Sequence, residues 1–266
     1  MGQWYLHLFD SSQPDLDWSN PEAHAEMLRV LRFWLDRGVD GFRIDVAHGL
    51  YKNPTLSDVP AGERHSIDNG HVWDRDEVLA VYQDWRALLD GYGGDRMLVG
   101  EVYLLDVPRV ARYVSDTRLH QAFNFTVIAT PWGAGPLRTI VETALEHFHP
   151  GTWVLSNHDR TRHVTRYGGG SLGRRRGLAV TALLLALPGS PYLYQGEELG
   201  LDEAEMPPDR RQDPIFHRTG GELPGRDGCR TPIPWAADDP GFGFTTGEPW
   251  LPFGGQRCAG CGRAAG

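Results

Sequence analysis

Cysteine is scarce in this chain, which has three cysteines among 266 residues. Three cysteines do not make the disulfide framework that is typical of small secreted domains. Cys258 and Cys261 form a single C-x-x-C, without the second pair or the nearby histidine that would complete a zinc site. We therefore expect neither a bound metal nor another cofactor, and a cytoplasmic location by default.

Long hydrophobic segments and an excess of basic residues are also lacking. The longest apolar run, residues 178–187, is shorter than the roughly 20 residues that cross a bilayer. Residues 1–4 do not start the charged-then-apolar pattern of a signal peptide. The net charge is −9, and Arg174–Arg176 is the only basic cluster, which we expect at the solvated start of a helix. These features predict neither a nucleic-acid partner nor a membrane partner.

What the chain does contain is a regular alternation of two kinds of segment. Segments with apolar residues at helical spacing and end signals alternate with short apolar runs typical of buried strands. Helices are predicted from Pro21 to Gly38, from 78 to 91, from 137 to 148 and from 178 to 187, and strands at 41–46, 96–101, 121–125, 152–155 and 191–194. Alternating strands and helices predict an α/β fold with parallel strands, of the β/α-barrel type.

The stretch Gly41–His48 is the centre of the functional prediction. Side chains alternate between the two faces of a strand, so Arg43 and Asp45 should be neighbours on one face. A guanidinium beside Asp45 would lower the pKa of that carboxyl and keep it ionised, which suits a nucleophile. The alternative is a purely structural ion pair.

Three predicted strands end in acidic residues, namely Asp45, Glu101 and the His158–Asp159 pair. Parallel strands bring these ends to one rim of a barrel, although three unrelated surface acids are the alternative. Glu101 ends an apolar run, so burial and nearby negative charge should raise its pKa and make it a general acid. Asp45 would then attack an anomeric carbon, and Asp159 and His158 would hold the sugar. A nucleophile and an acid about 5–5.5 Å apart imply glycoside cleavage with retention of configuration.

Five motifs then carry a family resemblance. Three conserved regions of the α-amylase family of glycoside hydrolases resemble the segments Gly41–Asp45, Gly100–Tyr103 and Ser156–Asp159. Two further segments resemble signatures of its α-glucosidase and oligo-1,6-glucosidase branch, namely Gln13–Asp17 (QPDLD) and Gly225–Trp235 (GRDGCRTPIPW). Asp17 stands where that branch usually has Asn, and Ile233 stands where it has Met.

The resemblance implies roles for individual residues. It makes Asp45 the nucleophile, Glu101 the acid/base and Asp159 the transition-state stabiliser, with Arg43, His158 and Arg226 as substrate-binding residues. Two pairs are left with structural alternatives. Phe123 and Phe125 form an aromatic wall or, as we favour, pack in the core, and Glu197–Glu198 face the pocket or, as we favour, serve in a cap or loop.

The chain also departs from the family pattern. The family's first conserved region, an Asp-x-Val-x-Asn-His stretch, does not occur in this sequence. The resemblance therefore implies an incomplete catalytic barrel in residues 1–253, with about strands four to eight of a (β/α)8 barrel and their helices. Residues 254–266 are expected to be a low-complexity, disordered tail. Because unpaired strand edges favour aggregation, we expect this polypeptide alone to be marginally folded and weakly active or inactive.

The leading hypothesis is a retaining α-glucosidase that hydrolyses terminal α-glucosidic bonds of short malto- or isomalto-oligosaccharides. The alternatives are a sugar-transferring relative, such as a sucrose isomerase or transglucosidase, and a non-catalytic truncated family member. Val46 lies where family members tune their preference between α-1,4 and α-1,6 bonds, but one residue does not decide the linkage. The oligomeric state is left open.

Overall fold

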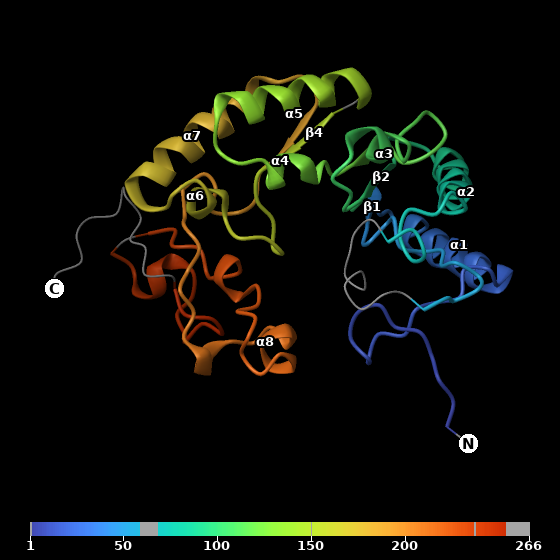
Figure 1. The fold of residues 1–266 in the computed structure, drawn as a ribbon, viewed down its shortest axis with the longest axis horizontal. Coiled ribbons are helices and arrows are strands. Elements are labelled where there is room, and N and C mark those ends of the chain that lie inside the picture. The colour runs from blue at the N-terminus through green and yellow to red at the C-terminus, as the bar shows by residue number, and fades with distance from the viewer. Residues whose placement is uncertain (1, 59–68, 150, 237, 254–266) are drawn as a thin grey trace. The chain divides into compact units, whose positions relative to one another are not determined.

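The structure is a computed structural model that describes residues 2–58, 69–149, 151–236 and 238–253. The tail predicted at 254–266, with Cys258 and Cys261, lies outside the described residues. The chain forms two compact units, and Figure 1 draws their helices and strands. Unit 1 comprises residues 1–125 and 143–150, and unit 2 comprises residues 126–142 and 151–266.

The described residues alternate between helices and short parallel strands, as predicted. The strands are β1 (Gly41–Ile44), β2 (Met97–Gly100), β3 (Gln121–Ala122), β4 (Thr152–Val154) and β5 (Ser190–Tyr192). The helices are α1 (Pro21–Leu35), α2 (Val78–Asp90), α3 (Val107–Ala111), α4 (Phe125–Ala129), α5 (Ala134–His147), α6 (His163–Arg166), α7 (Gly170–Ala186) and α8 (Pro214–Arg218). The 3₁₀ turns include η2 (Pro208–Arg210), η3 (Asp227–Cys229) and η4 (Pro240–Gly243).

Unit 1 contains a three-stranded parallel sheet in the order β1-β2-β3. Ile44 is paired with Gly100, and Gly100 is paired with Ala122, so the carboxyl ends of the three strands are level. Helix α1 begins as predicted, because the Asn20 side chain accepts a hydrogen bond from the Glu22 N–H and Pro21 occupies the first helical position. Helix α2 ends at Asp90 with Gly91 as its cap, also as predicted.

The only lysine in the sequence lies in unit 1. The Lys52 side chain is 10% exposed and pairs with Asp15, at 2.8 Å between Nζ and Oδ1. Its ammonium group also donates to the carbonyl groups of Gly49 and Leu50. These contacts join the segment that follows β1 to the Gln13–Asp17 motif.

Unit 2 contains the parallel pair β4–β5, with Trp153 opposite Pro191. Trp153 is fully buried, and its indole N–H donates to the Pro188 carbonyl at 2.9 Å. Helices α6 and α7 pack against each other at two glycines. A Cβ on Gly173 would lie 2.2 Å from the Val164 carbonyl oxygen, so only glycine permits this close approach.

The predicted boundaries differ from the structure at several places, since α1 ends at Leu35 and not at Gly38, and α5 begins at Ala134 and not at residue 137. The strand expected at 121–125 stops at Ala122, and helix α4 begins at Phe125. Helix α7 begins at Gly170, not at residue 178, so Arg174–Arg176 lie inside the helix and not at its start. The reason for the early start is long-range, because the Asp202 carboxylate accepts a hydrogen bond from the Gly170 N–H at 3.0 Å.

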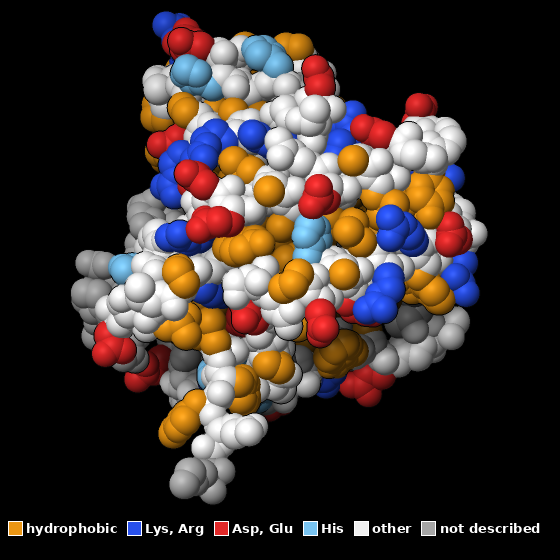
Figure 2. Space-filling view, turned by 90° about the vertical axis from the view of Figure 1, so that its right-hand side faces the viewer, with side chains coloured by type: hydrophobic (Ala, Val, Ile, Leu, Met, Phe, Trp, Pro, Cys, Tyr) orange, Lys and Arg blue, Asp and Glu red, His pale blue; other side chains and the backbone are white. Residues whose placement is uncertain are grey.

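The surface drawn in Figure 2 mixes charges of both signs, with Lys and Arg side chains beside Asp and Glu and hydrophobic side chains between them. Within the described ranges, no helix is long and apolar enough to cross a membrane. The expectation of no nucleic-acid partner stays a prediction.

Candidate active site

Asp45 and Glu101 directly follow the neighbouring strands β1 and β2 of unit 1. The backbone keeps the two chains together past the strand ends, because the Ala47 N–H donates to the Glu101 carbonyl and the Glu101 N–H donates to the Ile44 carbonyl, each at 2.8 Å. The predicted meeting of strand-end carboxylates is therefore observed for this pair.

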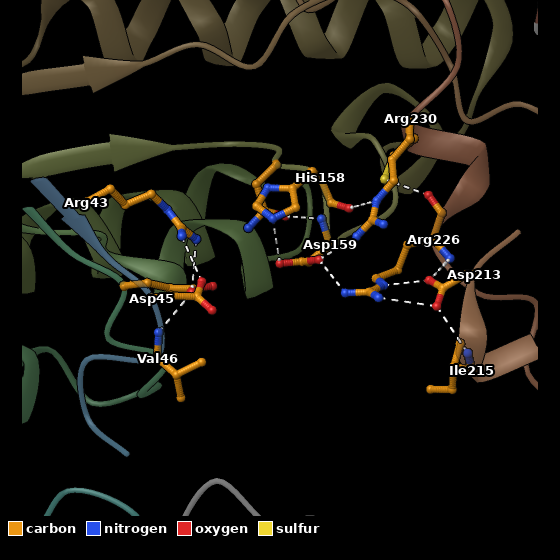
Figure 3. Close-up of polar contacts among 12 residues, drawn as sticks. Arg43, Asp45, Val46, His158, Asp159, Asp213, Ile215, Arg226 and Arg230 are labelled. Carbon is orange, nitrogen blue, oxygen red and sulfur yellow. Dashed lines mark hydrogen bonds and ion pairs between the residues drawn. The ribbon is translucent and has the colours of Figure 1, made fainter. Parts of the chain in front are cut away.

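The Arg43 guanidinium contacts both carboxylates, and Figure 3 shows it beside Asp45. Its Nη1 is 2.7 Å from Asp45 Oδ1, and its Nη2 is 2.9 Å from Glu101 Oε2. One guanidinium thus offsets the repulsion between two negative groups. The contact between Arg43 and Asp45 was predicted from strand alternation, whereas the contact between Arg43 and Glu101 was not.

The two carboxyl groups differ strongly in exposure. The Asp45 side chain is 73% exposed and the Glu101 side chain 12%. Burial raises the pKa of Glu101 to about 7, and a hydrogen bond with Asp45 adds to the rise, while the Val46 N–H and Arg43 oppose it. Glu101 can therefore hold a proton near neutral pH, in the direction that the sequence predicted.

The turn after Asp45 has an unusual backbone conformation. Val46 has φ = 44°, a left-handed conformation that a β-branched residue rarely adopts. In this conformation the Val46 N–H points to Glu101 Oε2 at 3.3 Å. Neither the strain nor this contact has a signal in the local sequence.

His48, a little further along the same turn, is a supporting residue that sequence reasoning missed. It is buried and stacks on Trp73, with ring centroids 5.0 Å apart. Burial lowers the pKa of His48 to about 4, so its ring is neutral at pH 7. Its carbonyl accepts from the Asp74 N–H at 2.8 Å, and Asp74 in turn holds Arg109 and Tyr113.

In unit 2, Asp159 lies on a short loop between β4 and α6. Ser156 closes this loop by accepting a hydrogen bond from the His163 N–H at 2.9 Å. The Asn157 side chain accepts from the Asp159 N–H at 3.0 Å. His158 Nε2 lies 3.2 Å from Asp159 Oδ2, so the two residues predicted to hold the sugar are in contact.

Two arginines meet the other oxygen of Asp159. Arg226 Nη1 and Arg230 Nη2 lie 2.8 and 2.9 Å from Asp159 Oδ1 (Figure 3). Arg230 also donates from Nε to the His158 carbonyl at 2.7 Å. Arg226 was predicted at this site. Arg230 was missed, although it lies in the same quoted motif.

Asp213, also missed, orients Arg226. Its side chain is fully buried and accepts hydrogen bonds from Arg226 Nε at 2.5 Å, Nη2 at 3.2 Å and the backbone N–H at 2.9 Å. Burial by itself would raise the pKa of Asp213, but the hydrogen bonds from Arg226 and Ile215 outweigh it and hold the pKa at about 2. In turn, the hydrogen bond to Asp213 raises the pKa of Arg226 above the usual value of an arginine.

The two pairs that were left with alternatives, Phe123 with Phe125 and Glu197 with Glu198, are held by contacts within the fold. Phe125 is 3% exposed and meets Tyr103 edge-on, so the favoured core packing is correct for it, and Phe123 is half-buried beside it. Glu198 accepts from the Gly196 N–H in a turn, as favoured. Glu197 is instead buried 3.8 Å from His163 Nδ1, and burial raises its pKa to about 7.

Among the described residues, no group of three or more His, Cys, Asp or Glu side chains could hold a metal ion. The Cys258–Cys261 pair lies beyond those residues. That the protein needs no metal or cofactor stays a prediction.

Comparisons with known proteins agree with the motifs. Residues 1–257 match the catalytic domain of α-amylase. The chain belongs to the α-amylase family. It is 37% identical to a probable α-glucosidase of Rhizobium meliloti (strain 1021), over 94% of this chain and 49% of that protein. It is 30% identical to an oligo-1,6-glucosidase of Parageobacillus thermoglucosidasius, over 94% of this chain and 51% of that protein.

Among solved structures, this α-amylase family chain is similar to an α-glucosyl transfer enzyme, with a TM-score of 0.83 and 40% identity. The match covers 94% of this chain and 50% of that one. The chain thus spans about half the length of the relatives that it matches.

Proposed function

We propose that this α-amylase family chain carries the catalytic carboxylates of a retaining α-glucosidase, which acts on terminal α-glucosidic bonds of short malto- or isomalto-oligosaccharides. One observation carries the proposal. Arg43 holds together an exposed carboxylate, Asp45, and a buried carboxyl group, Glu101, whose pKa is raised to about 7. Retaining glycosidases need this combination of an ionised and a protonated group on one bond.

In the proposed reaction, Asp45 forms a bond to the anomeric carbon while the bond to the leaving oxygen breaks, and Glu101 gives its proton to that oxygen. Water then attacks the glycosyl–Asp45 intermediate. Glu101 takes a proton from this water, and the Asp45 carboxylate is released. Two displacements at the same carbon retain its configuration.

Asp159 is proposed to stabilise the positive charge of the transition state and to bind sugar hydroxyls, with His158, Arg226 and Arg43 as further substrate-binding residues. Asp159 Oδ1 already has two guanidinium partners, and Asp159 Oδ2 has His158. These contacts fix the carboxylate in one orientation, which favours binding because little ordering remains when the sugar arrives.

The proposed architecture is an incomplete (β/α)8 barrel in residues 1–253, comprising about strands four to eight, followed by a tail at 254–266. The parallel pairing of β1-β2-β3 and of β4-β5 supports it. In such a barrel the carboxyl ends of the strands meet at one rim, where the active site of the barrel lies. A cytoplasmic location and an oligosaccharide substrate are parts of the same proposal.

Glucosyl transfer is the second candidate function, because the similar α-glucosyl transfer enzyme is 40% identical to this chain. A transferring enzyme or a sucrose isomerase would use the same first displacement, and a sugar hydroxyl would replace water in the second. A non-catalytic role is the third candidate. The presence of Asp45, Glu101 and Asp159 argues against a non-catalytic role.

The decisive assay follows release of nitrophenol from p-nitrophenyl α-glucoside by this polypeptide and by the longest natural polypeptide that contains it. Asp45→Asn should lower kcat by about three orders of magnitude or more, because the nucleophile is lost. Asp40→Asn is the matched control, since the Asp40 side chain is 90% exposed at the opposite end of the same strand. Hydrolysis that persists in Asp45→Asn would refute the proposal, and the products formed with excess maltose separate hydrolysis from transfer.

A further inference from the structure

Arg162 is a buried arginine in unit 2 that the proposed reaction does not use. It is 1% exposed and lies three positions after Asp159 in the sequence. A guanidinium is costly to remove from water unless its donors find partners, so its contacts show what it holds.

The Arg162 side chain joins two distant segments. Nη1 donates to the Gln195 carbonyl at 2.8 Å, in the loop after β5, and Nη2 donates to the Cys229 carbonyl at 2.9 Å, in the turn η3. The guanidinium lies 4.9 Å from the centre of the Tyr194 ring, and the Tyr194 hydroxyl donates to the same Cys229 carbonyl at 3.0 Å. The Arg162 backbone N–H is also engaged, by Glu203 Oε2 at 2.9 Å.

The Arg162 guanidinium has space to reach its two carbonyl partners because residue 196 is a glycine. Gly196 has φ = 90°, and a Cβ there would lie 2.9 Å from Arg162 Nη1. A larger residue would both strain the backbone and push the guanidinium away from its carbonyl partners.

The position of Cys229 gives these contacts their importance. Cys229 lies between Arg226 and Arg230, the two arginines that bind Asp159 Oδ1. Its Sγ donates to the Arg226 carbonyl at 3.1 Å. The Arg162 side chain therefore connects the loop that carries Asp159 to the turn that carries both of its partners.

We propose that Arg162 is a positioning residue, which holds the turn 226–230 so that Arg226 and Arg230 together orient Asp159. Lysine cannot replace it, because a single ammonium group does not present two donors at the fixed spacing that reaches two carbonyls. The expected loss of catalytic rate rests on the proposed glucosidase function. The expected loosening of residues 226–230 does not depend on that function.

Cys229 supplies a readout that needs no activity. Its thiol is buried, and burial raises its pKa to about 12, so it reacts with thiol reagents only when the turn opens. Arg162→Lys should accelerate its reaction with Ellman's reagent by about 10- to 100-fold, the factor expected for losing a hydrogen bond from a charged donor. Cys258 and Cys261 are replaced by serine in every variant.

Arg166→Lys is the matched control. Like Arg162, Arg166 donates to backbone carbonyls, in its case those of Thr161, Ile128 and Leu155, and none of them lies in the turn 226–230. Equal Cys229 reactivity in Arg162→Lys and Arg166→Lys would overturn the proposal. If Arg162→Lys does not fold, Gly196→Ala displaces the Arg162 guanidinium from its carbonyl partners, and an unchanged thiol rate there would equally overturn the proposal.

A mutant cycle tests the effect on turnover. Arg162→Lys should lower kcat/KM by about 10- to 100-fold, but it should have little further effect in an Arg226→Ala, Arg230→Ala background. Equal losses in both backgrounds would mean that Arg162 acts only through general stability. A wild-type chain without hydrolysis would count against the proposed function alone, and the thiol rates would still decide the role of Arg162.

Discussion

Asp45 and Glu101 carry the same functional group but differ in exposure, and Arg43 contacts both. Because the positive charge of Arg43 lowers the pKa of Glu101, it opposes the effect of burial. The pKa of Glu101 thus depends on burial, on Asp45, which raises it, and on Arg43, which lowers it. Replacing Arg43 tests this balance.

The first prediction concerns the pH dependence of kcat/KM. Glu101 must be protonated to act as an acid, so kcat/KM should fall as the pH rises through about 7, the pKa to which burial raises this group. In Arg43→Gln this alkaline limb should move to higher pH, whatever the loss of rate. Arg96→Gln, which removes an arginine paired with Asp40 at the other end of β1 and β2, should leave the limb in place. An alkaline limb that stays near pH 7 in Arg43→Gln would contradict the assignment to Glu101.

At the residue scale, the sequence predicted what depends on strand alternation and strand ends. Asp45, Glu101 and Arg43 follow from these rules, and the motifs add Asp159, His158 and Arg226. Asp213 could not be predicted, because its contact with Arg226 joins separate segments of the chain, and Arg230 was missed although it lies in the motif that identified Arg226. The left-handed conformation of Val46 is likewise set by the surroundings and not by the residue type.

At the scale of elements, α1 and α2 were predicted well because their end signals are local. Asn20 and Pro21 start α1, and Gly91 ends α2. Helix α7 was predicted too short because no side chain adjacent to its start caps it. Asp202 supplies the cap from beyond β5, and Thr165 donates to the other oxygen of that carboxylate at 3.0 Å.

The second prediction concerns this cap. Asp202→Ala should lower the free energy of unfolding by about 1–2 kcal/mol, as the loss of an N-terminal cap does, and should fray the first turn of α7. Urea denaturation measures the free energy, and hydrogen exchange at residues 170–173 locates the change. Asp209→Ala removes the same charge from an exposed position and serves as the control. Equal unfolding free energies for the two variants would show that Asp202 does not cap the helix.

At the scale of the whole molecule, several large apolar side chains are exposed on the described helices. On α7, Leu178 and Leu185 are 50% and 56% exposed. On α1, Phe33 and Trp34 are each 47% exposed. Apolar surface of this extent favours association. Sequence patterning predicted these helices, but which of their apolar side chains are covered depends on long-range packing.

The third prediction is that this polypeptide self-associates at micromolar concentration, as sedimentation velocity would show. Replacing Leu178 and Leu185 with glutamine should reduce the association with little change in unfolding free energy, because both side chains already contact water. Leu184→Ala is the contrasting variant, since Leu184 is buried, and it should cost about 2–5 kcal/mol without reducing association. A monomeric wild-type polypeptide would contradict the prediction.

The pairing of Lys52 with Asp15 also has a practical consequence. Since the sequence has no other lysine, a lysine-specific protease has a single place to cut, directly after residue 52. The ammonium group there is 10% exposed and engaged with Asp15 and two carbonyl groups, so the intact fold shields the peptide bond that the protease needs. The rate at which the protease converts the intact chain into two fragments, followed on a gel, would therefore report the rate at which unit 1 opens. This measurement needs neither a label nor a substrate.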